Sequence, residues 1–347
     1  MLHGEPVDVG TGHLLLPAVD VELPGALPLV LERLHRSSYR SGRFFGPTWA
    51  STLDQHLQVT DDEVVLARLD GVALHFPTSG GVAREDPRWT LALDGTTAVV
   101  GNGDRRWHFA GRDEQRWLVA IIERDHRIDV DRLADGTPLS VAHSGGYRVT
   151  VLAERDRIVG YDLVGAGPDG GDRALVRFGY EAGNLTAVVN SSGWPTRFGY
   201  DERGRITGWV DRRGTWFRHS YDDEDRVVAQ VGAGDTLSCT FAYDGPVVAR
   251  TDSLGHTARY VHDDDGRVTR TVDPLGHERH TEYDALRVVA KTDELGRTTR
   301  FGYDAIGVLD RVVRPDGSEV VEEHDEAGRP VRVRDADCAV WSHSYVA

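Results

Sequence analysis

The second half of the chain alternates apolar and polar residues over short runs. Phe178 and Tyr180 lie two residues apart, and the same spacing recurs in Phe198/Tyr200, Phe241/Tyr243 and Phe301/Tyr303. Side chains two residues apart lie on one face of a β-strand. Segments 206–210, 227–231 and 331–334 alternate in the same way and are bounded by turn-forming residues. The pattern therefore predicts β-hairpins and not helices.

Two landmarks recur in this region with one period. The first is a tyrosine or histidine that precedes an acidic residue, spaced 19 to 22 residues apart, at Tyr180, Tyr200, Tyr221, Tyr243, His262, Tyr283, Tyr303 and His324. The second is the glycine of a four-residue turn half a repeat away, at Gly193, Gly214, Gly255, Gly276, Gly296 and Gly317, with a degenerate copy at 231–234. Two independent markers with one period identify an internal repeat of about eight units.

Each unit contains two turns. In the first, such as Asp273–Gly276, the aspartate accepts backbone hydrogen bonds and the glycine supplies positive φ. The second is a Tyr-Asp-x-x-Gly-Arg segment, from which Asp225, Arg287 and the shortened 243–246 depart. Because one hairpin cannot bury its own apolar face, we expect one antiparallel ribbon that stacks as a solenoid or spiral. We also expect the repeat tyrosines to pack ring against ring.

This unit resembles the YD repeat of Rhs proteins, of teneurins and of the C component of insecticidal toxin complexes, over residues 178–347. Residues 4–57 resemble the N-terminal segment of Rhs proteins, through 4–12, 16–17, 20–29, 36–39 and 45–49. This second match favours a bacterial Rhs protein. The resemblance implies a spiral β-sheet that closes into a hollow shell around a toxic C-terminal domain.

The expected organisation has three parts. These are an N-terminal Rhs-associated segment at 1–57, a β-rich lead-in at 58–177 and the array of about eight YD repeats at 178–347, with the loop 165–171 as the main internal boundary. The expected fold class is all-β, a spiral of antiparallel hairpins. We expect an open or partial shell, because the repeats are few, the chain ends inside a repeat, and neither a self-cleavage motif nor a toxin follows.

Composition and charge exclude several classes of protein. The chain has 39% hydrophobic and 28% charged residues, which is typical of globular proteins, and its 39 glycines favour many tight turns. A net charge of −16 disfavours binding to nucleic acid. No apolar run reaches the roughly 18 residues of a membrane span. The N-terminus lacks the pattern of a signal peptide, so we expect synthesis in the cytoplasm and export, if any, by a specialised secretion system.

No pattern nominates an active site. Nucleophile-elbow, P-loop and dinucleotide-binding patterns are absent. Cys239 and Cys338 have no partner at metal-ligand spacing, and the fifteen histidines are scattered. The run Asp263–Gly266 lacks the further acids of a calcium loop. Asp273–Gly276 resembles the core of an aspartyl self-cleavage motif, but other repeats carry turns in that slot. We therefore expect no catalytic residue, no metal and no cofactor.

The main hypothesis is structural: a plug-like N-terminal segment and a curved repeat wall form part of a toxin-enclosing shell. The expected partners are a passenger toxin polypeptide or the remainder of the shell, and a secretion apparatus. The rival hypothesis is a module that binds a cell-surface glycan, with Trp194, Trp209 and Trp216-Phe217 as a sugar-stacking platform. Cross-strand packing explains the same aromatic residues without a ligand. A third hypothesis is an enzyme whose site the sequence does not reveal.

Overall fold

The computed structural model describes residues 2–3, 7–112, 114–305, 307–325 and 328–345. Residues 4–6 of the N-terminal motif and 326–327 of the last Asp-x-x-Gly-Arg turn lie outside this description. Within it the regular structure is β, apart from one 3-10 turn, η1 (Ala233–Asp235). The predicted all-β fold class is therefore confirmed. A search of the described residues finds no helix long and apolar enough to cross a membrane.

The chain forms two compact units, one of residues 2–240 and one of residues 241–347. In the first unit, the N-terminal residues form a small ribbon and a three-stranded sheet: β1 (Leu2–His3) and β2 (Val7–Asp8), then β3 (Leu15–Leu23), β4 (Leu29–Arg36) and β5 (Trp49–Ser51). Burial alternates strictly along β4. Its buried face carries Leu29, Leu31, Arg33 and His35, so two ionisable side chains lie in the interior.

The lead-in strands curl back on themselves around one hydrophobic core. They are β6 (His56–Val59), β7 (Glu63–Ala67), β8 (Ala73–Pro77), β9 (Gly81–Val82), β10 (Thr90–Asp94), β11 (Thr97–Asn102), β12 (Arg105–Ala110) and β13 (Gln115–Glu123). Strand β13 pairs with β6 as well as with β12 and β14. Leu57, Phe76 and Phe109 are among the fully buried residues of this core.

From β13 onward each strand pairs with the next in antiparallel hairpins. The strands of the first unit are β14 (His126–Arg132), β15 (Pro138–His143), β16 (Arg148–Glu154), β17 (Arg157–Leu163), β18 (Arg173–Glu181), β19 (Asn184–Asn190), β20 (Pro195–Tyr200), β21 (Ile206–Val210), β22 (Trp216–Tyr221) and β23 (Val227–Gly232). Strands β17 and β18 pair directly across the loop 165–171, with Leu163 opposite Arg173. The sheet therefore continues through the segment in which the sequence placed a boundary.

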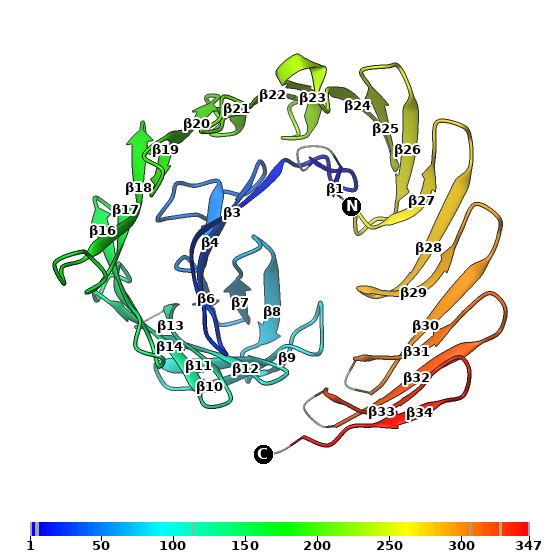
Figure 1. The fold of residues 1–347 in the computed structure, drawn as a ribbon, viewed down its shortest axis with the longest axis horizontal. Coiled ribbons are helices and arrows are strands. Elements are labelled where there is room, and N and C mark those ends of the chain that lie inside the picture. The colour runs from blue at the N-terminus through cyan, green and yellow to red at the C-terminus, as the bar shows by residue number, and fades with distance from the viewer. Residues whose placement is uncertain (1, 4–6, 113, 306, 326–327, 346–347) are drawn as a thin grey trace. The chain divides into compact units, whose positions relative to one another are not determined.

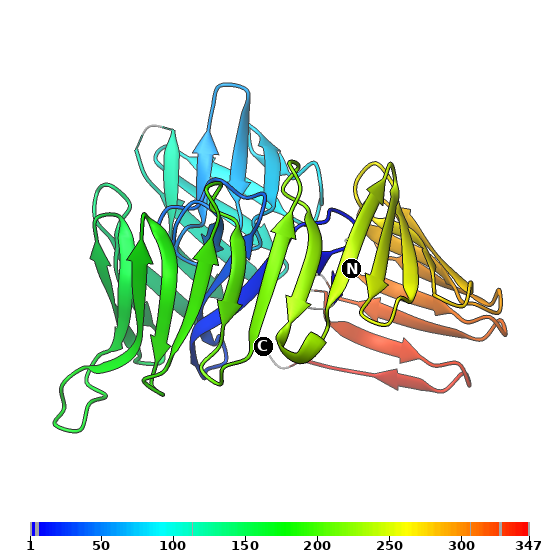
Figure 2. The same ribbon diagram turned by 90° about the horizontal axis from the view of Figure 1, so that it is seen from above.

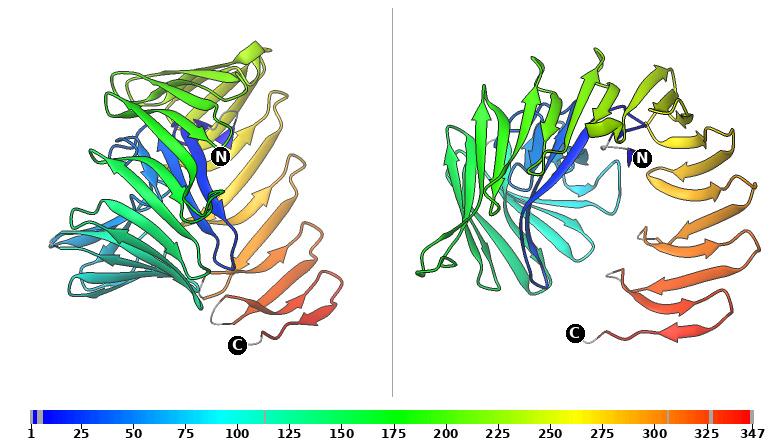
Figure 3. Two further views of the ribbon diagram at one scale, coloured as in Figure 1. Left: turned by 60° about the vertical axis from the view of Figure 1, so that its left-hand side comes forward. Right: turned by 45° about the horizontal axis from the view of Figure 1, so that its top comes forward.

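In this unit β3 and β4 lie against the inner side of the strands from β16 to β22 (Figures 1 and 3). Hydrogen bonds connect the two layers at four places, because residues of the N-terminal segment bond to Ile158 of β17, to Tyr180 of β18 and to the turn residues Gly204 and Asp225. The predicted N-terminal segment is thus a second layer on the wall of hairpins.

The second unit is a simple succession of hairpins (Figure 2). Strand β24 (Cys239–Asp244) spans the boundary between the units. It is followed by β25 (Val247–Asp252), β26 (Thr257–His262), β27 (Val268–Val272), β28 (Glu278–Asp284), β29 (Arg287–Thr292), β30 (Thr298–Tyr303), β31 (Leu309–Val313), β32 (Glu319–His324), β33 (Pro330–Arg334) and β34 (Val340–Ser342). Each strand from β25 onward pairs with the following one in antiparallel register.

The hairpin turns have the chemistry that the repeat predicted. In the turn Asp211–Gly214, the Asp211 carboxylate accepts the backbone N–H groups of Arg213 and Thr215, each at 2.8 Å. Gly276, in the equivalent turn, has a φ of +89°, as expected. Left-handed backbone suits glycine because it has no Cβ to clash.

One further copy of this turn was missed in the sequence. Asp335 accepts the N–H groups of Asp337 and Ala339, and Cys338 occupies the glycine slot with a φ of +65°. Its thiol is exposed, whereas that of Cys239 is buried. The repeat period places Asp335 21 residues after Arg314, which begins the preceding turn, so the period was the signal that could have revealed it.

Candidate functional site

The repeat tyrosines are held by their hydroxyl groups. The hydroxyl of Tyr221 donates to the carbonyl oxygen of Ile206 at 2.6 Å, and that of Tyr303 donates to Val288 at 2.8 Å. The same bond joins Tyr200 to Leu185, Tyr283 to Val268 and Tyr345 to Pro330. In each case the acceptor lies 15 residues earlier, at or next to the start of the neighbouring strand, which pairs with the strand that leads to the tyrosine. Each tyrosine therefore ties one repeat to the previous one.

An arginine completes the ties of Tyr221, Tyr283, Tyr303 and Tyr345. The Arg205 guanidinium pairs with Asp201 of its own turn, with Nε 2.7 Å from Oδ2, and lies 4.7 Å from the ring centre of Tyr221 in the next repeat. The equivalent Arg267 pairs with Asp263 and lies 5.3 Å from the ring centre of Tyr283. A cation over an aromatic face is attracted by the ring quadrupole. The Tyr-Asp-x-x-Gly-Arg segment is thus both a turn and a clamp between hairpins.

This arrangement corrects the predicted packing of ring on ring. No ring-to-ring contact joins Tyr200, Tyr221, Tyr283 and Tyr303 to one another within the described structure. Equivalent residues of consecutive hairpins are two strand spacings apart, about 9.5 Å, whereas aromatic pairs need centroid distances of about 4.5–7 Å. The side chains of Arg205 and Arg267 occupy the space between consecutive tyrosine rings. All of these tyrosines are partly buried, as expected.

Histidine replaces tyrosine at two of the repeat positions and makes different contacts. His262 Nδ1 lies 3.1 Å from the carbonyl oxygen of Asp263. The buried His324 lies between two carboxylates, with Nδ1 3.3 Å from Asp304 and Nε2 3.5 Å from Glu322. In the part of the chain that the structure describes, no group of three His, Cys, Asp or Glu side chains is arranged so that it could hold a metal ion.

The N-terminal segment, defined here as residues 7–57, packs its aromatic side chains on the first repeats. Phe45 meets Phe178 edge to face, with the ring centres 5.0 Å apart. Trp49 meets Phe198 in the same way at 5.7 Å, and its indole Nε1 donates to the hydroxyl of Tyr200 at 3.0 Å. Phe45 and Trp49 are almost fully buried. The segment therefore covers the inner face of these hairpins with a continuous aromatic layer.

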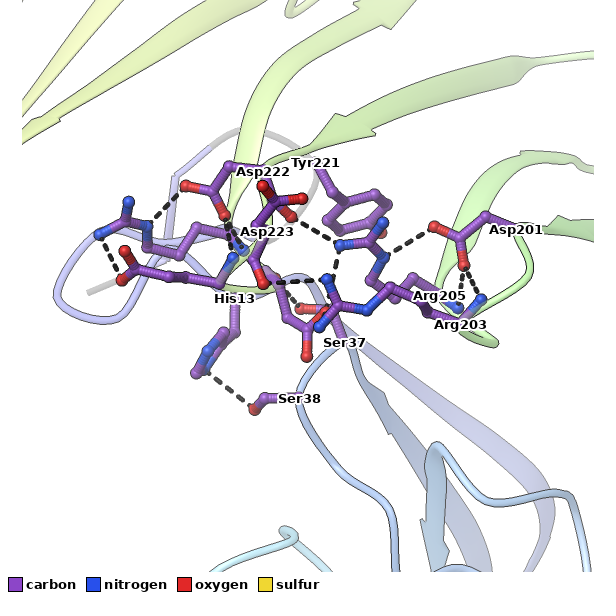
Figure 4. Close-up of polar contacts among 12 residues, drawn as sticks. His13, Ser37, Ser38, Asp201, Arg203, Arg205, Tyr221, Asp222 and Asp223 are labelled. Atoms are coloured by element: carbon purple, nitrogen blue, oxygen red, sulfur yellow. Dashed lines mark hydrogen bonds and ion pairs between the residues drawn. The ribbon is translucent and has the colours of Figure 1, made fainter.

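At the edge of this aromatic layer, a cluster of polar side chains holds the N-terminal segment against the repeats (Figure 4). The Asp225 carboxylate bonds Arg40 of the N-terminal segment at 2.8 Å, and also Arg203 at 2.9 Å and Arg205 at 3.1 Å. The Ser37 hydroxyl donates to the carbonyl oxygen of Asp225 at 2.8 Å. Asp225 stands in a glycine slot with a φ of +64°, which aspartate tolerates better than most residues. Asp225, the residue that departs from the repeat, thus makes a contact that attaches the N-terminal segment.

Two buried carboxylates lie inside the N-terminal segment. Asp20 forms two hydrogen bonds with Arg33, at 2.9 and 3.1 Å, and both side chains are almost inaccessible. Asp54 accepts the N–H groups of Arg43 and Phe44 and the Ser51 hydroxyl. Burial raises the pKa of both carboxyl groups. Both carboxylates are thus held by groups of the N-terminal segment itself.

The aromatic residues singled out as a sugar platform separate into two sets. Trp194 and Trp209 border one cavity of about 480 Å³, together with Leu16, Val19, Arg212 and Arg213. Trp194 is 70% exposed. Phe217 is buried and packs against Trp209, with ring centres 5.2 Å apart, while Arg218 lies over Trp216 at 5.1 Å. The structure therefore brings together two of the four predicted residues and uses Phe217 in packing.

Comparisons with known proteins agree with the repeat. Residues 4–76 match the model of a domain of unknown function (DUF6531), and residues 180–215 match the model of the RHS Repeat. The first match covers the segment that resembled the Rhs N-terminus. The second covers the repeat in which Tyr180, Tyr200 and Arg205 make the contacts described above.

Similar solved structures belong to a toxin complex. The crystal structure of TcdB2-TccC3-Cdc42 is 11% identical, with a TM-score of 0.47 over 91% of this chain and 22% of that chain. The Tc holotoxin pore of Photorhabdus luminescens is 10% identical, with a TM-score of 0.42 over 93% of this chain and 24% of that chain. The chain thus spans less than a quarter of the length of these proteins. With its hydrogen-bonded YD units and the match of residues 180–215 to the RHS Repeat model, the chain contains repeats of the Rhs/YD kind.

Proposed function

We propose that this chain is a structural segment of an Rhs-type toxin shell, which encloses or presents a passenger toxin polypeptide. The observation that carries the proposal is the docking of the N-terminal segment on the inner face of the first repeats. Phe45 and Trp49 are buried there against Phe178 and Phe198. A wall whose inner face is built to be covered by polypeptide is suited to containment rather than to catalysis.

The second unit has positions equivalent to the inward residues that the N-terminal segment covers in the first unit. Phe178 and Phe198 stand two residues before a repeat tyrosine, and the equivalent positions in the second unit include Thr281 and Phe301. Phe178 and Phe198 are buried, whereas Thr281 and Phe301 are only partly so. These later positions therefore remain accessible to a polypeptide partner, either a passenger or a further part of the shell.

Site-specific photo-cross-linking tests the proposal. A photoreactive residue placed at 281 or 301 lies on the inner face, and one placed at 282 or 300 lies on the opposite, exposed face of the same strands, β28 and β30. In the full-length protein isolated from the cells that make it, we expect the inner positions to cross-link to a passenger polypeptide and the outer ones not to. Equal cross-linking from both faces, or none from the inner face, would contradict the proposal.

A second candidate function is binding of a saccharide, and the cavity at Trp194 and Trp209 is the observation that favours it. Pockets of about 300–1,000 Å³ with a few polar groups suit small ligands, and aromatic faces suit sugar rings. Arg212 and Arg213 at the mouth are exposed and form no side-chain ion pair within the described residues. The chemistry fits an acidic sugar.

Titration with an acidic oligosaccharide such as oligogalacturonate, followed by calorimetry, tests this candidate. We expect binding that is lost in Trp194→Ala and weakened in the double variant Arg212→Gln/Arg213→Gln. Trp341→Ala is the matched control, because Trp341 is also exposed but lies in the other unit. Binding that survives Trp194→Ala, or that Trp341→Ala removes equally, would exclude this site.

A further inference from the structure

Two buried histidines lie at the junction between the N-terminal segment and the repeats, close enough for a charge on one to act on the other. His35 is on the buried face of β4 and is 0% exposed, and His219 is on the inner face of β22 and is 4% exposed. Neither imidazole nitrogen of either side chain has a hydrogen-bond partner within the described structure. Buried polar groups are nearly always hydrogen-bonded, so two unpaired imidazoles at one junction call for an explanation.

The surroundings of His35 disfavour a positive charge. Its ring packs against Trp49 of β5, with centres 5.3 Å apart, and against Tyr200 of β20, at 6.4 Å. The charged groups that act on it are the cations Arg33 and Arg40, together with His219 whenever that imidazole is protonated. A protonated imidazole at this position would therefore be both desolvated by burial and repelled by the neighbouring cations.

His219 occupies a position that other repeats fill with an apolar ring. Equivalent residues, two before the repeat tyrosine, are phenylalanine in Phe178, Phe198 and Phe241, all buried, and in the partly buried Phe301, whereas Thr281 takes the position in another repeat. The sheet therefore accepts phenylalanine here without difficulty. The repeat whose side chain acts on His35 carries the ionisable His219 where those repeats carry phenylalanine.

We propose that His35 and His219 form a pH-sensitive latch, in which acidification releases the N-terminal segment from the inner face of the repeats. Both imidazoles are neutral in the docked state, and both become accessible to water when the segment leaves. Protonation is then possible only in the released state, so protons act as a ligand that favours release.

The sign and the size of the effect follow from the titration of each group. Burial lowers the pKa of His35 to about 3, with repulsion from His219, Arg40 and Arg33 adding to it, and burial lowers the pKa of His219 to about 4. Groups with a depressed pKa in the docked state stabilise docking above their free pKa of about 6.5 and lose that contribution as the pH falls below it. Between pH 7 and pH 5 each histidine weakens docking roughly 20-fold, and together roughly 500-fold.

Other titratable groups of the same junction also affect the pH dependence of docking, and their contributions can be separated from those of His35 and His219. His13, which bonds the Ser38 hydroxyl and lies near Asp8, Asp225, Arg36 and Arg226, has its pKa lowered to about 4 by burial and by Arg36, so it acts in the same direction. Asp20 and Asp54 have raised pKa values through burial, so they oppose release at low pH. Comparing the native protein with variants of His35 and His219 cancels these contributions.

Hydrogen exchange of the β4 amides, corrected for intrinsic rates at pH 7 and pH 5, tests the latch. In the native protein we expect protection of residues 29–36 to fall on acidification. In the double variant His35→Phe/His219→Phe the loss should be roughly 500-fold smaller, and in His219→Phe alone roughly 20-fold smaller. His280→Gln changes an exposed histidine of the second unit and should leave the loss unchanged.

The experiment still tests the latch if the double variant His35→Phe/His219→Phe fails to fold. His219→Phe restores the residue type of the neighbouring repeats, so it carries the test alone if the double variant is unstable. Protection of residues 29–36 that does not fall between pH 7 and pH 5, or a fall that His219→Phe leaves unaltered, would overturn the latch.

Discussion

Removal of one hydroxyl group should show how much the tie between repeats contributes. In Tyr221→Phe the ring keeps its place under Arg205, but the 2.6 Å hydrogen bond to the carbonyl oxygen of Ile206 is lost. A net hydrogen bond contributes about 0.5–1.5 kcal/mol, and a buried acceptor left unpaired adds to the loss. We therefore expect about 1–2 kcal/mol for Tyr221→Phe, and about 3–5 kcal/mol for Tyr221→Ala, which also removes a largely buried ring.

The chain contains a matched control. Tyr345 makes the same tie, with its hydroxyl 2.8 Å from the Pro330 carbonyl oxygen and Arg329 4.5 Å from its ring centre, but it is 43% exposed. Water can replace that hydrogen bond, so Tyr345→Phe should cost less than about 0.5 kcal/mol.

Hydrogen exchange resolved by segment is the suitable assay, because a chain of two units need not unfold in one step. Tyr221→Phe should speed exchange of the β21–β23 amides roughly 5- to 30-fold, at a factor of ten for each 1.4 kcal/mol. An unchanged rate in Tyr221→Phe, or an equal effect of Tyr345→Phe on its own hairpin, would refute the reasoning that buried hydroxyl groups hold the repeats together.

Three further predictions follow from single turns. Gly276→Val should destabilise the β27–β28 hairpin by about 1–3 kcal/mol through backbone strain alone, because a Cβ there meets nothing within 4 Å, and Gly276→Asn should cost clearly less; exchange of that hairpin measures both. Asp225→Gly keeps the left-handed turn but removes the carboxylate that pairs with the partly exposed Arg40, so docking of the N-terminal segment should weaken by about 0.5–1 kcal/mol, measured as faster exchange of residues 29–36. Cys338→Gly should stabilise the last hairpin by about 1 kcal/mol in the same assay, and in the native protein a thiol reagent should modify Cys338 well before the buried Cys239.

The turns were predictable because their chemistry is local. An aspartate that accepts the N–H groups two and four residues later, followed by a glycine at positive φ, needs no information from elsewhere in the chain, as in Asp211–Gly214. The fixed spacing of two such turns then determines the hairpins between them. The same logic explains why a repeat of about 20 residues could be identified from sequence alone.

The ties between repeats were harder to predict because they depend on distance in space. The sequence placed the tyrosines at equivalent positions, but the separation of two strands leaves a gap that ring contact cannot close. The structure fills it with Arg205 or Arg267, residues that the motif contained but to which no role had been assigned.

The docking of the N-terminal segment lay beyond the reach of pattern analysis. Arg40 and Asp225 are 185 residues apart, and so long a contact leaves no periodic signal. From the sequence, Asp225 was only an irregular copy of a turn, and His219 was one of many scattered histidines.

Both irregular residues belong to one repeat, and both face the N-terminal segment. His219 stands where the two preceding repeats have Phe178 and Phe198. Asp225 stands where the preceding turn of the same kind has Gly204. In a stack of equivalent hairpins, each unit meets the same neighbours, so packing between hairpins alone would favour the same residue in every copy. Asp225 makes such an additional contact, because its carboxylate pairs with Arg40 and its carbonyl oxygen accepts the Ser37 hydroxyl. At this turn the departure from the repeat coincides with the docking of the N-terminal segment.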